Sequence, residues 1–102
     1  MTYTGNPMTE AMYYILLALM NPNHGYQLMA AIDQVSNGRI KMGPGTLYGV
    51  LTRLQKDGLI VILNDDGRRK TYVITEAGKV ALRAEYKRLK DMVQDGILVE
   101  EI

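Results

Sequence analysis

The hydrophobic residues in the first part of the chain recur at helical spacing, which predicts consecutive helices. The first stretch follows Thr9 and runs to about Met20. It is apolar on nearly every face, so we expect a helix that is covered on two sides. After the break at residues 21–23, a second amphipathic stretch runs from about Gly25 to Val35. The pattern therefore predicts two helices separated by a short turn.

A third helix is predicted from Pro44 to Asp57. Proline suits the first position of a helix, and Gly58 suits the position after its last turn. Its apolar residues recur at intervals of three and four, which defines a buried face made of Leu47, Val50, Leu51 and Leu54. Residues 39–42, just before this helix, are long enough for only one short strand.

The pattern then changes to two β-rich runs, "LIVILN" and "RKTYVI", at residues 59–64 and 69–74. Asp66-Gly67 lies between them and is a strong hairpin signal. Thr75 begins a charged helix that continues to about Leu98. The predicted fold class is mainly α with a small β-hairpin. Residues 1–74 would form a winged helix-turn-helix DNA-binding domain, and residues 75–102 a C-terminal dimerisation helix.

The net charge of +1 hides an uneven distribution along the chain. Residues 39–72 hold seven of the twelve basic residues but only three of the eleven acidic ones. A polyanion would therefore bind the middle of the chain.

The composition excludes several classes of function. The chain has no cysteine and one histidine, His24, so disulfide scaffolds, zinc fingers and multi-histidine metal sites are excluded within one chain. We expect no metal and no cofactor. The longest apolar run, residues 12–20, is far shorter than the roughly 20 residues that span a bilayer, so we expect a cytoplasmic protein without a membrane partner.

No catalytic site is apparent in the sequence. The segment "GPGTLYG" has glycine spacing that matches neither the dinucleotide-binding fingerprint nor the P-loop. The only serine and the only histidine, Ser36 and His24, lie about 18 Å apart at opposite ends of one predicted helix. We therefore expect the protein not to be an enzyme.

The third helix and the hairpin provide a candidate surface for DNA. Opposite the leucine face lie two glycines and polar side chains that suit close approach to a phosphate backbone. The hairpin tip adds three basic residues, beside Asp65 and Asp66, which we expect to pair with the arginines when DNA is absent. The predicted DNA-binding residues are Gly45, Thr46, Tyr48, Gly49, Thr52, Arg53, Lys56, Arg68, Arg69 and Lys70.

The last helix carries a heptad-like seam, Leu82, Tyr86, Leu89 and Val93. The seam alone fits an intramolecular packing face as well as a dimer interface. The nearly all-apolar first helix, which needs cover on a second side, favours the dimer and adds Met12, Ile15 and Leu16 to it. A small apolar or aromatic effector would contact Met12, Tyr86, Leu89 and Met92.

The sequence resembles the PadR family of bacterial transcriptional regulators over nearly its whole length. The resemblance rests on "TEAMYYILLAL", "HGYQL", "GPGTLYGVLTRLQKDGLI" and "RRKTYVITEAG", in that order. It implies a winged-helix repressor that binds a palindromic operator as a homodimer. The last helix would cross to the partner's first helix, as in the smaller subfamily with a single dimerisation helix. The resemblance also points to Tyr48, its neighbours and the hairpin as DNA contacts.

Some small members of this family bind flat aromatic drugs between tryptophans of the two last helices. Here the corresponding position is Leu89, with Tyr86 one turn earlier, and the chain has no tryptophan. An aromatic sandwich of that kind is therefore not expected. Two other classes of function remain open: a winged-helix module that binds proteins, and a carrier of apolar ligands.

Overall fold

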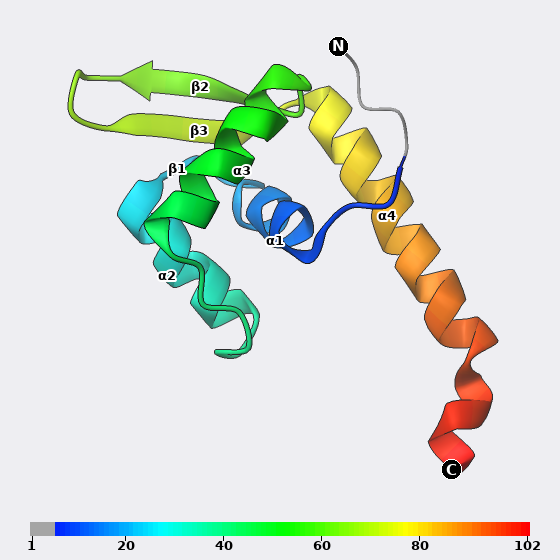
Figure 1. Ribbon diagram of the computed structural model, residues 1–102. Helices are drawn as coiled ribbons and strands as arrows, with labels where there is room; N and C mark the ends of the chain where they lie inside the picture. The colour runs from blue at the N-terminus through cyan, green and yellow to red at the C-terminus, as the bar shows by residue number, and fades with distance from the viewer. Residues whose placement is uncertain (1–5) are drawn as a thin grey trace.

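Three helices, a small antiparallel sheet and a long fourth helix follow one another in the computed structural model, which describes residues 6–102 (Figure 1). Residues 1–5 of the predicted domain 1–74 lie outside this range. The elements are α1 (Glu10–Ala18), β1 (Asn23–His24), α2 (Gly25–Val35), α3 (Pro44–Lys56), β2 (Ile60–Asp65), β3 (Lys70–Ile74), α4 (Glu76–Asp95) and a short 3-10 helix (Ile97–Glu101). The predicted fold class, a winged helix-turn-helix with a long C-terminal helix, is confirmed.

The sheet has the strand order β1-β3-β2, and both pairings are antiparallel. The strand predicted within residues 39–42 was wrong. The third strand of the sheet is instead β1, which directly precedes α2. Residues 39–42 form an irregular connection instead. Ser36 holds its start: its hydroxyl donates to the Asp33 carbonyl at 3.1 Å and accepts from the Ile40 amide at 3.0 Å.

The core lies where the first three helices meet the base of the hairpin. Apolar residues spaced three or four positions apart are buried on each helix, as a helix with one face inside the protein requires. Val50 of the predicted leucine face is only half-buried. The fully or almost fully buried side chains are Ile15, Leu16, Leu19, Leu28, Ile32, Leu47, Leu51, Leu54, Leu59 and Ile60.

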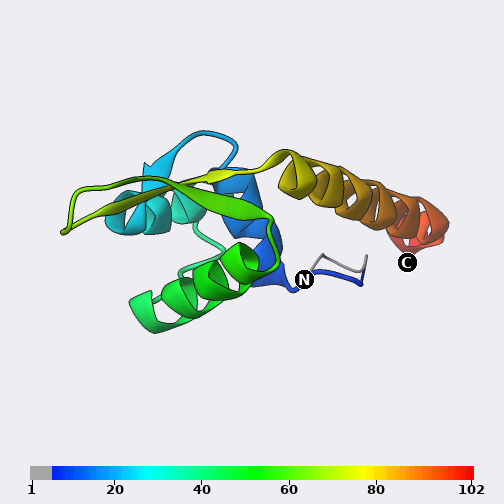
Figure 2. The same ribbon diagram turned by 90° about the horizontal axis from the view of Figure 1, so that it is seen from above.

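Helix α4 starts against the sheet and then leaves the rest of the protein (Figures 1 and 2). The Thr75 hydroxyl accepts from the Gly78 amide at 3.0 Å and donates to the Gly58 carbonyl at 2.7 Å, which fixes the first turn. A Cβ at Gly78 would overlap the Leu59 carbonyl, so only glycine allows this close approach. Leu82 is still buried, whereas Val93 is 70% exposed. The first turns of α4 therefore belong to the core.

Glu85 connects α4 to the segment before α1. Glu85 is 5% exposed, and its carboxylate forms a two-pronged ion pair with Arg88, with N–O distances of 2.6 and 2.9 Å. The same carboxylate accepts from the Met8 amide at 3.3 Å. The hydrogen bonds from Arg88 are the main reason that the pKa of Glu85 lies below its usual value, with the Met8 amide adding to the effect.

Candidate nucleic-acid interface

Helix α3 buries one face and leaves the opposite face open. Leu47, Leu51 and Leu54 are at most 1% exposed, which fixes the rotation of the helix about its axis. The predicted DNA-binding residues on α3 are therefore all exposed: Gly45, Thr46, Tyr48, Gly49, Thr52, Arg53 and Lys56. The basic side chains lie in the last turns of the helix, and the glycines lie in its first half.

The two glycines on this face have no packing role within the chain. A Cβ at Gly45 or Gly49 would meet nothing within 4 Å. A glycine inside a helix costs about 1 kcal/mol relative to alanine. Because the fold does not require Gly49, its small size is better explained by something that approaches from outside. This observation agrees with a helix whose outer face lies close to a partner.

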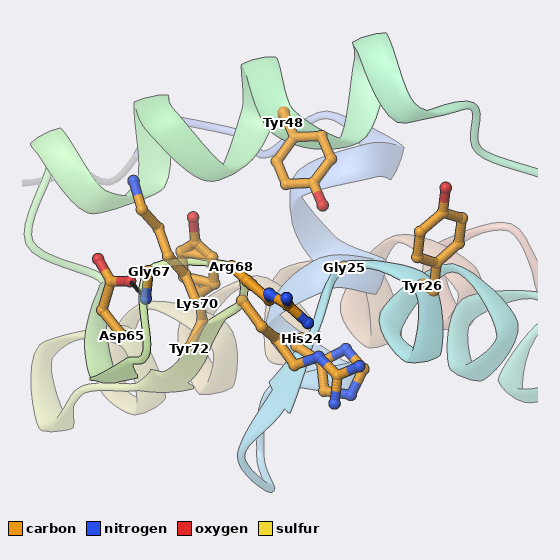
Figure 3. Close-up of a pocket in the computed structure, with 10 residues that line it drawn as sticks. His24, Gly25, Tyr26, Tyr48, Asp65, Gly67, Arg68, Lys70 and Tyr72 are labelled. Atoms are coloured by element: carbon orange, nitrogen blue, oxygen red, sulfur yellow. Dashed lines mark hydrogen bonds between the residues drawn. The ribbon is translucent and has the colours of Figure 1, made fainter.

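Tyr48 extends from α3 toward the start of α2 (Figure 3). A Cβ at Gly25 would overlap the Tyr48 hydroxyl, so a glycine at the first position of α2 leaves room for the tyrosine ring. Tyr48 is nevertheless 47% exposed. Its hydroxyl therefore lies beside the first turn of α2 and in reach of solvent.

A groove of about 410 Å³ runs between the first turn of α2, Tyr48 and the hairpin, with the buried Tyr72 on β3 in its lining. The remaining lining residues are His24, Gly25, Tyr26, Asp65, Gly67, Arg68, Arg69 and Lys70. The groove therefore brings the predicted hairpin residues together with Tyr48, although they come from different elements.

The tip of the hairpin is held by its own acidic residues. Asp65 accepts from the Gly67 amide at 2.9 Å, and Asp66 accepts from the amides of Arg68 and Arg69 at 3.0 and 2.8 Å. The Arg68 amide, followed by that of Arg69, holds the pKa of Asp66 below its usual value. The expected pairing of these carboxylates with arginine side chains is wrong: they bind backbone amides instead. Within residues 6–102, the Arg68 and Arg69 side chains form no ion pair.

Two of the predicted residues on α3 have partners in the helix or at its C-terminal cap. The Thr52 hydroxyl donates to the Tyr48 carbonyl at 2.8 Å. Arg53 pairs with Asp57 at 3.1 Å, and the arginine side chain is 69% exposed. The Asp57 side chain is 13% exposed, whereas the guanidinium faces solvent, so Arg53 can reach a phosphate oxygen by giving up this one pair.

Sequence reasoning missed the contribution of α2 to this surface. His24, Gly25 and Tyr26 line the groove, and Tyr26 is 83% exposed. The only available signal was the segment "HGYQL", which is one of the motifs that carry the family resemblance. Its pattern of apolar residues does not indicate that it lies beside the hairpin. The first turn of α2 reaches the groove because β1 pairs with β3 immediately before it.

The residues predicted for a dimer and an effector are distributed over two regions. Ile15 and Leu16 are fully buried in the core, so their assignment to a dimer interface is corrected: the domain itself covers that face of α1. Tyr86 and Val93 are exposed, and Leu89 and Met12 are half-buried. Tyr86 lines a hollow between α1 and α4, whereas Leu89 lines a second one beside Glu85.

Two other kinds of site are absent from residues 6–102. No helix in this range is long and apolar enough to cross a membrane. The same residues contain no cluster of three histidine or acidic side chains that could hold a metal ion.

An exposed helix face beside a basic hairpin, both carried by a three-helix core, defines a winged-helix DNA-binding regulator. The sequence profile of the "Transcriptional regulator PadR-like family" matches residues 15–84. The chain therefore belongs to the PadR-like family of transcriptional regulators, and the prediction that it is not an enzyme is confirmed.

Individual relatives agree with this assignment. The transcriptional regulator YqjI of Escherichia coli is 33% identical over 74% of the chain and 36% of its own length. The transcriptional regulator Rv3488 of Mycobacterium tuberculosis is 36% identical over 74% of the chain and 70% of its own length. The crystal structure of a PadR family regulator from Eggerthella lenta is 30% identical, with a TM-score of 0.63 over 83% of this chain and 71% of that one. For YqjI and one further curated relative, the chain spans only 36% and 28% of the relative's length.

Proposed function

We propose that this regulator is a repressor that binds a palindromic operator in double-stranded DNA as a homodimer. The observation that carries the proposal is the groove shared by Tyr48, the start of α2 and the hairpin, beside the open glycine face of α3. The face of α3 would enter the major groove, and the hairpin would contact the flanking backbone. Thr46 and Thr52 offer hydroxyl groups, and Lys56, Arg68, Arg69 and Lys70 offer positive charge.

The homodimer is supported by the half of α4 beyond Glu85. This part of the helix carries large exposed apolar side chains, among them Tyr86, Met92 and Val93, at 57%, 56% and 70% exposure. A second copy would cover them. We assign dimerisation to this segment and DNA binding to the residues before α4. In a twofold dimer on B-DNA, the two α3 helices would lie about 34 Å apart, one turn of the duplex.

A selection from a random duplex library tests the operator and the dimer together. The expected product is an inverted repeat whose half-site centres lie about one helical turn apart. A single unrepeated site would contradict the homodimer, and no enrichment would contradict DNA recognition. A reporter behind the selected operator then tests repression: expression should rise when the gene for the regulator is deleted. A fall in expression would identify an activator.

We extend the proposal to a small apolar or aromatic effector that binds near Leu89 and Met92 on the exposed part of α4. Release from DNA requires that the ligand bind more tightly to the arrangement that does not bind the operator, and DNA must weaken the ligand by the same factor. Titration with 8-anilinonaphthalene-1-sulfonate tests this. Loss of operator affinity supports an effector. Dye binding without any change in operator affinity favours an apolar-ligand carrier.

A further inference from the structure

The groove beside the hairpin contains a hydroxyl group that the fold leaves without a partner. Tyr72 lies on β3, opposite Asn23 of β1 and Ile62 of β2, and is 6% exposed. Its hydroxyl forms no hydrogen bond within residues 6–102. Every fully buried side-chain nitrogen or oxygen in that part of the chain has a partner, so the small exposed part of Tyr72 includes the hydroxyl. Because Tyr72 lines the groove, this hydroxyl faces into it.

Two further tyrosines surround the same groove, Tyr26 from α2 and Tyr48 from α3 (Figure 3). Both side chains are exposed, and neither hydroxyl forms a hydrogen bond in the part of the chain that the structure describes. Burial, followed by the Coulombic effect of Tyr48 and Asp65, raises the pKa of Tyr72, so its hydroxyl stays protonated at neutral pH. The groove therefore offers three hydroxyl donors and two accessible aromatic rings.

The groove is basic on the side of the hairpin. Residues 68–70, two arginines and a lysine, line it, and none of their side chains forms an ion pair within residues 6–102. One acidic residue is in the lining, Asp65, and its carboxylate accepts from the Gly67 amide at 2.9 Å. The excess of positive charge favours an anionic ligand.

The first turn of α2 adds backbone donors to this surface. The N-cap residue, His24, forms no side-chain cap, so the first amides of α2 have no side-chain acceptor there. Pairing of His24 with Thr71 of β3 holds this turn beside the hairpin. The start of a helix favours an anion, because its amides point outward and its dipole is positive there. Together with the unpartnered Tyr72 hydroxyl, this feature indicates a small anion within the groove.

We propose that the groove binds a mononucleotide, with its phosphate between the hairpin side chains, the start of α2 and the Tyr72 hydroxyl. The base would lie against the rings of Tyr26 and Tyr48, since flat bases stack on tyrosine. A phosphate monoester carries close to two negative charges at neutral pH and has three acceptor oxygens, which matches the charge and the donors of the groove. The groove volume of about 410 Å³ falls within the range of about 300–1,000 Å³ for small-molecule sites.

The proposal rests on the proposed DNA interface, because Tyr48 and the hairpin are assigned to operator contact as well. A mononucleotide in the groove would compete with the operator, and each ligand must weaken the other by the same factor. Tyr72 distinguishes the two ligands. Its hydroxyl lies at the floor of the groove, where a small ligand can enter but the continuous backbone of a duplex stays outside. The site is separate from the region of Leu89 and Met92 proposed for an apolar effector.

Isothermal titration calorimetry of the full chain without DNA tests the site. Adenosine and uridine 5′-monophosphate are the probes, and the matching nucleoside and inorganic phosphate are the controls that each lack one half. We expect at least one probe to bind with a dissociation constant below about 1 mM, and each half to bind at least about tenfold more weakly. Absence of binding by both probes would overturn the proposal. Equal affinity for one half alone would do so as well.

Tyr72→Phe tests where the nucleotide lies. The change keeps the buried ring and removes only the hydroxyl, so the fold should be retained, which thermal unfolding checks. Nucleotide affinity should fall about three- to tenfold, the range of one lost hydrogen bond, whereas operator affinity should change by less than about twofold. Tyr13→Phe on α1, outside the groove, is the matched control. If Tyr72→Phe binds the nucleotide as tightly as Tyr13→Phe, the proposed placement is wrong.

Arg69→Gln at the exposed hairpin tip is a second variant, and its folding does not depend on the core. It should weaken both the nucleotide and the operator, because the guanidinium is assigned to both phosphates. Unchanged nucleotide affinity in this variant would contradict a phosphate at the hairpin.

Competition separates this inference from the proposed function. At constant ionic strength, a saturating nucleotide should lower operator affinity about tenfold or more in fluorescence anisotropy. Unchanged operator affinity with the nucleotide bound would overturn the groove as its site. A chain that binds the nucleotide but no DNA would overturn the proposed function and leave this inference standing. DNA binding without nucleotide binding would do the reverse.

Discussion

The Tyr48 hydroxyl occupies the space that a side chain at Gly25 would need. This contact links α3, whose outer face is exposed, with the first turn of α2. It also places Tyr48 in the groove beside the hairpin (Figure 3). The ring is held by the shape of the groove, because no hydrogen bond of its hydroxyl to the groove is present within residues 6–102.

Gly25→Ala should therefore weaken operator binding without unfolding the protein. The nearest atoms to the new methyl group belong to the far end of the Tyr48 side chain, which can move, so the fold should tolerate the change. Displacement of Tyr48 should cost about three- to tenfold in DNA affinity, the range of one lost hydrogen bond. Fluorescence anisotropy with a labelled operator measures the loss. In a Tyr48→Ala background, Gly25→Ala should have no further effect, and a full additional loss would show that Tyr48 is not the cause.

Gly49→Leu should reduce operator affinity by about tenfold or more while stability is unchanged or higher. Leucine has a good helix propensity, and a Cβ at position 49 meets nothing within 4 Å, so we expect its bulk to act mainly on an approaching partner. Gly49→Ala is the matched control and should have a much smaller effect. Gel-shift titration together with thermal unfolding checks both variants. An unchanged operator affinity for Gly49→Leu would show that the side of α3 that carries Gly49 does not face DNA.

The hairpin should contribute through charge. Arg68→Ala and Arg69→Ala should each lower the affinity for all DNA sequences, and each should reduce the slope of log affinity against log salt by about 0.9, the value for one phosphate contact on B-DNA. Lys87→Ala on α4 is the control, because Lys87 lies on the far helix and pairs with Asp91. Wild-type function in the Arg68→Ala, Arg69→Ala double variant would favour a protein-interaction module over a DNA reader.

Glu85→Gln should destabilise the protein by roughly 1.5–3 kcal/mol at neutral pH, the range for hydrogen bonds to a charged group. The pKa of Glu85 in the folded chain lies below its ordinary value of 4.5, so the ionised carboxylate stabilises the fold at pH values above 4.5. This contribution is lost as the pH falls from 4.5 through the lowered pKa. Urea unfolding at pH 7 and pH 3, at fixed protein concentration, should show a difference between the two proteins that narrows in acid. A difference that is the same at both pH values would assign the effect to packing.

The local signals in the sequence predicted most of the fold. Hydrophobic spacing defined α1 to α3, Asp66-Gly67 located the hairpin, and Thr75 located the start of α4. Contacts between distant segments were not predictable in this way. The two residues of β1 form a strand only because β3 lies beside them. The position of Tyr48 likewise depends on Gly25, which is far away in the sequence.

The same limit explains the errors in the predicted site. A helix that is apolar all round does not reveal which face its own domain covers, so Ile15 and Leu16 were assigned to the wrong surface. The aspartates at the hairpin tip looked like partners for arginine side chains, but the turn uses their carboxylates to bind its own amides. Glu85 is buried because the segment before α1 contacts it. The spacing between Glu85 and Arg88 along the sequence does not reveal this contact.

The salt dependence of binding to DNA from the chain's own promoter tests the central claim most directly. The measurement is operator affinity over a salt series, for the wild-type chain and for Gly49→Leu. We predict tight binding at low salt that falls linearly on a log–log plot, with a slope reflecting several phosphate contacts, and a large loss for Gly49→Leu. Absent binding at low salt, or an affinity that does not change with salt, would contradict DNA recognition by α3 and the hairpin.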